Sequence, residues 1–221
     1  MFLQKYKQAL DVIVKKPIML WGLSLLSVVI TALLSIVTTP IFALGIAIGW
    51  LVSCGMVKVY LDGLKGKEVN SDQLFAAFNK NALRVIGAMA WMCLWIVIWA
   101  MVPIAGPIIA IVKSYSYKFV PYIVMTRPDV TATQALRLSM EMTKGKKGQM
   151  FLADLCFYGG IFVVSFVLGL FSAIPFIGVL FALVTFVFAL AVSLFSPIFV
   201  GLYSAAFYDD AEVKEEIPAN V

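Results

Sequence analysis

The sequence contains no histidine and little charge. Charged residues make up 13% of its 221 residues and hydrophobic residues 62%, whereas soluble domains carry about 25% charged residues. The absence of histidine excludes histidine-based catalysis and histidine metal ligands. The three cysteines, Cys54, Cys93 and Cys156, lie far apart in apolar segments. Because no CxxC spacing is present, we interpret them as small apolar side chains rather than as disulfide or metal-site residues.

Catalytic patterns are also missing. Asp154 is the only carboxylate within an apolar segment, so it lacks the second group that paired acid–base catalysis needs. No serine-hydrolase, zinc-protease or nucleotide-binding glycine motif occurs. We therefore expect no enzymatic activity, no cofactor and no metal, and we do not expect nucleic acid as a partner.

Long apolar segments dominate the chain. Each has about the length that crosses a hydrocarbon core of about 30 Å. They cover residues 17–38, 41–61, 81–102, 108–126, 149–172 and 176–208. The sequence therefore predicts an all-α polytopic membrane protein with six transmembrane helices, paired as three helical hairpins. The last segment exceeds the bilayer thickness, so we expect it to tilt, to bend near Pro197 or to project into water.

Short amphipathic segments precede the predicted hairpins. Residues 2–15 place apolar side chains on one helical face. Thr131 and Gln134 match the capping box that starts a helix, and Asn70 with Gln73 comes close to it. We expect each segment to form an amphipathic elbow helix on the cytoplasmic membrane surface.

The chain is predicted to be one membrane domain, residues 1–208, followed by an acidic, disordered cytoplasmic tail, residues 209–221. Three segments of the domain share a plan of amphipathic stub, apolar run, proline-bearing turn and second apolar run. We interpret residues 1–62, 63–126 and 127–208 as internal repeats of like orientation. The composition that membrane proteins share is the alternative explanation. The matching stubs are Gln8-Ala9-Leu10, Gln73-Leu74-Phe75 and Gln134-Ala135-Leu136, and the turns contain Pro40, Pro103 and Pro175.

The basic residues predict the orientation of the chain. No lysine or arginine occurs in residues 17–57, 85–112 or 148–213. By the positive-inside rule, both termini and both elbows lie in the cytoplasm and the three turns lie outside. The cytoplasmic cluster Lys144, Lys146 and Lys147 is a candidate contact for anionic lipid headgroups. Alternatively, these charges serve only to set the orientation of the chain in the membrane.

Polar residues within the apolar segments form a candidate intramembrane site, namely Lys113, Ser114, Tyr117, Lys118 and Asp154. Lys118 and Asp154 lie at similar depths on neighbouring segments. We predict that they pair, because an unpaired charge in hydrocarbon costs several kcal/mol. Lys113 has no charged partner in the outer half, so it either lines a wet cavity or extends outward past the turn at Pro107. These residues either stabilise the fold or line a pathway for a substrate or an ion.

A longer pattern runs from Tyr122 to Phe157. It contains Tyr122-Ile123-Val124, Pro128-Asp129, Ala135-Leu136 with Ser139-Met140, Gly145-Lys146-Lys147 and Phe151-Leu152-Ala153-Asp154-Leu155-Cys156-Phe157. This pattern resembles the DUF975 family of bacterial integral membrane proteins, from which Arg127 and Cys156 depart. The family is distantly similar to the membrane domains that accompany glycerophosphodiester phosphodiesterases. The resemblance implies a bacterial cell and lipid surroundings, and it supplies no active-site residues.

Two functions remain open for a multi-pass protein of the bacterial plasma membrane. The first is a non-enzymatic protein that binds membrane lipids or an amphipathic peptide, or holds another membrane protein, in an envelope-stress or protection role. The second is a small permease or transporter component with a polar pathway around Lys113. A lipid-facing groove between repeats would favour the first function, and a cavity that reaches Lys113 from water would favour the second. The oligomeric state is not predicted.

Overall fold

The computed structural model describes residues 2–15, 17–38, 42–79, 82–174 and 176–216, and within these residues it contains helices and turns but no strand. The all-α fold class is therefore confirmed. The α-helices are α1 (Phe2–Lys15), α2 (Pro17–Thr38), α3 (Phe42–Leu64), α4 (Ala82–Ala100), α5 (Gly106–Ser116), α6 (Val120–Thr126), α7 (Ala132–Met142), α8 (Lys147–Ser172) and α9 (Gly178–Glu216). Two 3₁₀ turns, η1 (Ser71–Gln73) and η2 (Ala76–Phe78), lie between α3 and α4.

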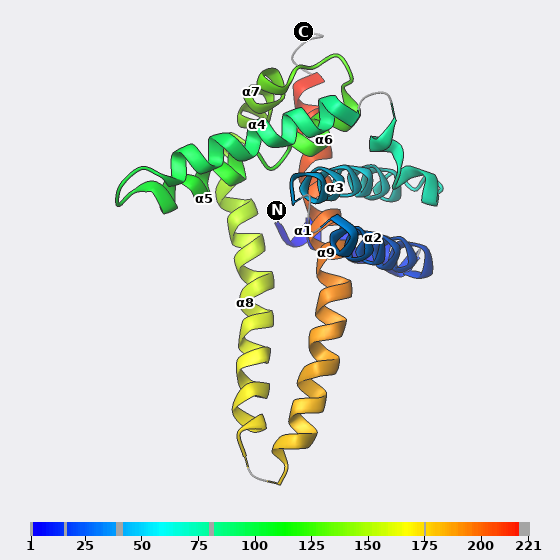
Figure 1. The fold of residues 1–221 in the computed structure, drawn as a ribbon, viewed down its shortest axis with the longest axis vertical. Coiled ribbons are helices and arrows are strands. Elements are labelled where there is room, and N and C mark those ends of the chain that lie inside the picture. Colours follow the sequence, from blue (N-terminus) through cyan, green and yellow to red (C-terminus); the bar gives the residue numbers. More distant parts are fainter. Residues whose placement is uncertain (1, 16, 39–41, 80–81, 175, 217–221) are drawn as a thin grey trace.

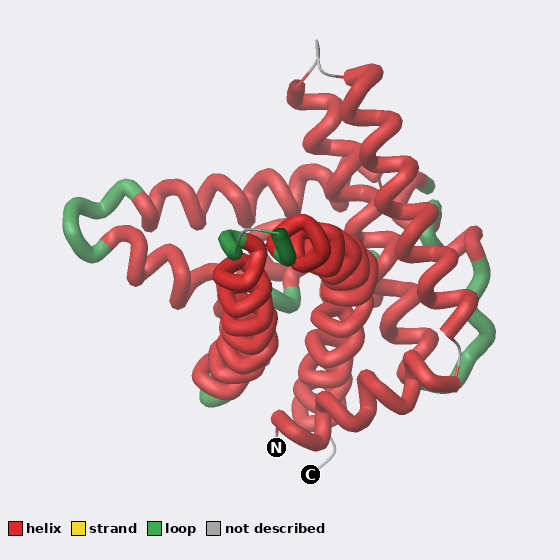
Figure 2. Tube along the Cα trace, turned by 90° about the horizontal axis from the view of Figure 1, so that it is seen from below, coloured by secondary structure: helices red, strands yellow, loops and turns green. Residues whose placement is uncertain are grey.

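The molecule consists of a stem and a platform. The stem is α8 together with the part of α9 before Pro197, and these two helices pack on each other and extend away from the other helices (Figure 1). The platform comprises α1 to α7 and the end of α9. Seen along the stem, the α4–α5 and α2–α3 pairs extend sideways in different directions (Figure 2). The three helix pairs therefore do not run parallel, as they would if all six helices crossed one flat membrane.

Several helices have the composition of membrane spans. Five described stretches are long and apolar enough to cross a bilayer, namely Ala43–Leu64, Ala82–Ala100, Gly106–Thr126, Lys147–Ser172 and Gly178–Val213. The first predicted segment contributes only a shorter apolar stretch, Gly22–Thr31. A membrane protein with several apolar helices is thus supported, and the count of six spans stays a prediction.

The predicted fourth segment is not one helix. It divides into α5 and α6, and the backbone between them makes a tight turn in which the Val120 amide donates to the Tyr117 carbonyl at 3.0 Å. Pro121 stands in the first turn of α6. Proline has no amide hydrogen and its ring clashes with the preceding helical turn, so a continuous helix is disfavoured here.

The acidic end of the chain is helical rather than disordered. α9 continues through Pro197 to Glu216, so the prediction of a disordered tail is wrong for residues 209–216, and residues 217–221 lie outside the described residues. Cations from separate parts of the platform hold this end in place. They form the ion pairs Lys5–Asp210, Lys65–Asp209 at 3.4 Å and Arg127–Glu212 at 3.9 Å.

The two internal elbows differ. α7 begins at the predicted capping box, in which Thr131 Oγ1 accepts from the Gln134 amide at 3.4 Å and the Thr131 amide donates to Gln134 Oε1 at 2.9 Å. The first elbow forms 3₁₀ turns, and the Asn70 side chain makes no capping hydrogen bond. Gln73 instead donates to Asp62 Oδ2 at 2.9 Å, which removes it from the capping position.

The core lies where the end of α9 packs against α1, α3 and α7. Its largest fully buried side chains include Tyr203, Phe207 and Tyr208 of α9. Gly201 permits the closest approach, since a Cβ atom there would overlap the ring of Tyr60 on α3. The Tyr60 hydroxyl donates to the Pro197 carbonyl at 3.1 Å. This hydrogen bond joins α3 to α9 beside the close contact at Gly201.

The turns after α4 and α8 have the same unusual backbone. Ile104 and Phe176 adopt φ angles of 65° and 72°, a region that costs a side chain about 1–2 kcal/mol. Both side chains are fully exposed. In each turn a glycine follows two residues later, Gly106 or Gly178, where a Cβ atom would overlap a carbonyl of the preceding helix. The internal repeat stays a prediction, and its first turn, 39–41, lies outside the described residues.

Candidate intramembrane polar site

The predicted pair of Lys118 and Asp154 is present. Lys118 Nζ lies 2.8 Å from Asp154 Oδ2 and 3.1 Å from Oδ1. The two side chains are 19% and 16% exposed, so each charge is largely removed from solvent. A buried charge is tolerated when its partner is close and its remaining hydrogen-bonding capacity is satisfied. The pair therefore joins the segment between α5 and α6 to α8.

Aromatic side chains surround this ion pair. The Tyr115 hydroxyl donates to Asp154 Oδ2 at 2.8 Å. Lys118 Nζ lies 5.3 Å from the ring centre of Tyr115 and 5.4 Å from that of Tyr203, within the range of cation–π attraction. Tyr115, three residues before Lys118, could have been inferred from helical spacing. Tyr203 had no such signal, because it reaches the site from α9.

Tyr6 brings the amphipathic helix α1 to the same place. Its hydroxyl donates to the Ala153 carbonyl, next to Asp154, and its ring centre lies 5.0 Å from Phe199 and 5.6 Å from Tyr203. Burial raises the pKa of Tyr6 to about 12, and Cys156 and Asp154 add smaller effects in the same direction. The phenol therefore stays neutral at physiological pH and serves as a hydrogen-bond donor.

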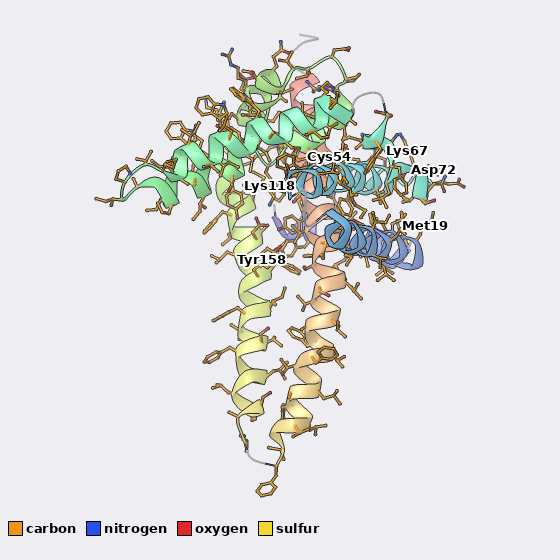
Figure 3. All side chains as sticks on the ribbon, viewed as in Figure 1. Met19, Cys54, Lys67, Asp72, Lys118 and Tyr158 are labelled. Atoms are coloured by element: carbon orange, nitrogen blue, oxygen red, sulfur yellow. The ribbon has the colours of Figure 1, made fainter. Side chains whose placement is uncertain are left out.

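A groove of about 490 Å³ opens beside Lys118, in the angle between the stem and the α2–α3 pair. Figure 3 shows Lys118 and Tyr158 near the top of the stem, where it joins the platform. Most of the wall is apolar, with hydroxyl groups and one ammonium group set into it. The lining residues with polar side chains are Ser27, Thr31, Ser53, Tyr60, Lys118, Tyr122, Tyr158, Ser196 and Ser204.

One hydroxyl group near the groove is buried without a partner. The hydroxyl oxygen of Tyr203 has no hydrogen-bond partner among the described residues. The neighbouring Ser204 lines the groove and lies within hydrogen-bonding reach of Tyr122, whose own hydroxyl donates to the Gly201 carbonyl at 3.2 Å.

The other predicted site residues lie elsewhere. Lys113 Nζ stands 4.9 Å from the ring centre of Trp99 on α4. Tyr117 also forms a side-chain hydrogen bond with Trp99, and the exposed Ser114 donates to the Ile111 carbonyl at 2.7 Å. Lys113, Ser114 and Tyr117 are not among the residues that line the groove. The partner of Lys113 is thus an aromatic ring, which neither sequence interpretation of this lysine included.

Basic side chains beyond the groove have separate roles. Arg84 of α4, which the sequence did not single out, donates to the carbonyls of Val124, Arg127 and Val130 at 2.6, 3.1 and 3.0 Å and so holds the end of α6. The cluster Lys144, Lys146 and Lys147 lies at the junction of α7 and α8, next to Gly145, whose φ is 78°. Its contact with lipid headgroups stays a prediction.

Comparisons with known proteins give no relative. No protein-family model, no curated protein and no solved structure matches the chain. The resemblance to the DUF975 family therefore stays a prediction, and the function is argued from the site itself.

Proposed function

We propose that this chain is a non-enzymatic protein of the bacterial plasma membrane that binds a membrane lipid in the groove beside Lys118. The observation that carries the proposal is the position of the groove between the stem and the α2–α3 pair, with mostly apolar walls into which hydroxyl groups and one ammonium group are set. Ligand sites of this kind have volumes of about 300–1,000 Å³ and a few placed polar groups. The groove, at about 490 Å³, falls in this range.

The chemistry of the wall favours a lipid with a hydrogen-bonding head. Lys118 is neutralised by Asp154, so the site has no net charge to attract a free anion from water. The hydroxyl of Ser204 lines the groove and offers both a donor and an acceptor. A phosphoglyceride head satisfies such groups, and its acyl chain suits the apolar wall. The proposal includes cytoplasmic termini, with Lys144, Lys146 and Lys147 against anionic headgroups.

Mass spectrometry of lipid that copurifies with the full chain tests this function. Gly49→Phe places a ring in the groove, because a Cβ atom at Gly49 meets open space. Gly169→Phe is the matched control, since Gly169 is equally open but lies on the stem outside the groove. We expect Gly49→Phe to retain about tenfold less lipid, which corresponds to a loss of about 1.4 kcal/mol. Equal lipid in all three proteins, or a bound peptide instead of lipid, would contradict the proposal.

The transporter alternative has a test of its own. Lys113 contacts Trp99 and does not line the groove, so we expect Lys113→Met to retain lipid as the wild type does. In vesicles with a pH-sensitive dye and a potassium indicator, we expect no proton or potassium flux from either protein. Flux in the wild type that Lys113→Met abolishes would favour the permease.

A further inference from the structure

The α4–α5 pair of the platform is not placed as a membrane-crossing hairpin beside the stem. It extends sideways from the stem, as both views show, and the α2–α3 pair extends sideways in another direction (Figures 1 and 2). α7, the amphipathic elbow helix, packs against α4, whereas α8 packs mainly on α9. α7 exposes Thr133, Arg137 and Glu141 to water. A helix that crossed the bilayer would meet a surface helix only at its end, so extensive packing on α7 indicates that α4 runs beneath the surface.

Tryptophan spacing along α4 gives independent support. Trp91, Trp95 and Trp99 follow one another at intervals of four residues, so they lie along one side of the helix. The rings of Trp91 and Trp95 pack edge to face, with ring centres 5.9 Å apart. Tryptophan prefers the membrane–water interface. A crossing helix would spread the three rings over about 12 Å of depth, whereas a helix in the membrane plane holds all three at one depth.

The uncovered side of the pair is apolar. Leu94, Val97 and Ile98 are exposed on α4, and the tip presents the fully exposed Ile104. No charged residue occurs between Val85 and Val112. Acyl chains of a lipid leaflet are the partner that this surface fits.

Helix lengths distinguish the two pairs. α4 has 19 residues and α5 has 11, or about 28 Å and 16 Å, so α4 is at the lower limit of a span and α5 reaches a spanning length only together with α6. α8 has 26 residues, about 39 Å, which is sufficient to cross it. We propose that the α4–α5 pair lies within the cytoplasmic leaflet, parallel to the membrane plane, while the stem crosses the bilayer. This inference is independent of lipid binding in the groove.

Tryptophan depth measures the placement directly. Three variants of the full chain each keep Trp91, Trp95 or Trp99 and carry phenylalanine at the other four tryptophan positions. They are reconstituted in phosphatidylcholine and phosphatidylglycerol vesicles that contain nitroxide lipids labelled at a shallow or a deep position. We expect the same shallow depth for all three. Depths that step by about 12 Å from Trp91 to Trp99 would overturn the proposal.

Cysteine labelling gives a second readout on the side of the membrane. In a background with Cys54, Cys93 and Cys156 replaced by alanine, single cysteines are placed by Ile104→Cys, Phe176→Cys and Lys144→Cys. A membrane-impermeant maleimide is added to intact and to permeabilised cells. We expect Ile104→Cys not to react in intact cells, the control Lys144→Cys to react only after permeabilisation, and Phe176→Cys to react in intact cells. Reaction of Ile104→Cys in intact cells would overturn the proposal. Failure of Phe176→Cys to react in intact cells would overturn it too, because the stem would then not cross the bilayer.

Discussion

The stem and the platform are both apolar, but they differ in how much of their apolar surface is buried within the chain. None of the most apolar window of α8 is buried in the chain and only 6% of that of α9, whereas half of the α3 window is buried. The stem helices contact mainly each other. Lipid replaces the protein around them, because apolar side chains gain little from packing together in hydrocarbon. In the platform, hydroxyls, ion pairs and close glycine contacts specify how the helices meet.

The largest effect is expected where the platform meets the stem. Asp154→Leu removes the partner of Lys118 and leaves a buried cation, which costs about 3–5 kcal/mol. The measurement is thermal unfolding of the purified chain in detergent. The double variant Lys118→Met with Asp154→Leu removes both charges, so we expect it to recover most of the stability. If the double variant were as unstable as Asp154→Leu, the stability would come from packing rather than from the ion pair.

The same substitution, glycine to alanine, is made once in the platform and once in the stem to compare how tightly the two regions pack. Gly201→Ala in the platform forces a methyl group against Tyr60, and overpacking of this kind costs about 1–3 kcal/mol. Gly169→Ala in the stem meets open space, so we expect it to be neutral or to stabilise α8 by up to about 1 kcal/mol. Thermal unfolding in one detergent compares both variants. Equal destabilisation would show that the stem packs as tightly as the platform.

Alkaline pH tests the contact of α1 with the stem. Because the pKa of Tyr6 rises from 10.0 in the unfolded chain to about 12 in the fold, its contribution is complete below pH 10 and is lost as pH rises through 12. We expect the stability difference between wild type and Tyr6→Phe to shrink over this interval. Unfolding by denaturant at several pH values measures it. A difference that stayed constant would mean that the Tyr6 hydroxyl does not titrate with folding.

The smallest effect is expected at the tip of the α4–α5 pair. Ile104→Gly relieves a left-handed backbone, which we expect to stabilise the chain by about 0.5–1 kcal/mol after the entropy of glycine is counted. Ile108→Gly in α5 is the matched control, and in a helix it costs about 1 kcal/mol. Opposite shifts in the unfolding temperature would support the strained turn. Destabilisation by both variants would contradict the strained turn.

Local signals in the sequence predicted local structure well. The T-x-x-Q capping box predicted the start of α7 at Thr131, and the similar depths of Lys118 and Asp154 along neighbouring segments predicted their pairing. Both depend on short or regular separations along helices. The contacts of Tyr203 with Lys118 and of Asp210 with Lys5 join distant segments, and composition alone carries no information about them. The directions of the helix pairs could not be predicted for the same reason, since apolar length indicates that a helix fits a membrane but not how it is oriented.

Sideways placement of α4 and α5 has a mechanical consequence for the bilayer. Two helices held in one monolayer occupy lateral area there, and the opposite monolayer receives only the cross-section of the stem. Such an imbalance bends the sheet of lipids toward the less crowded face, as amphipathic inserts do. In the proposed placement, many copies together would therefore favour membrane that bulges toward the cytoplasm, such as the inward edge of a constricting division site, over flat bilayers.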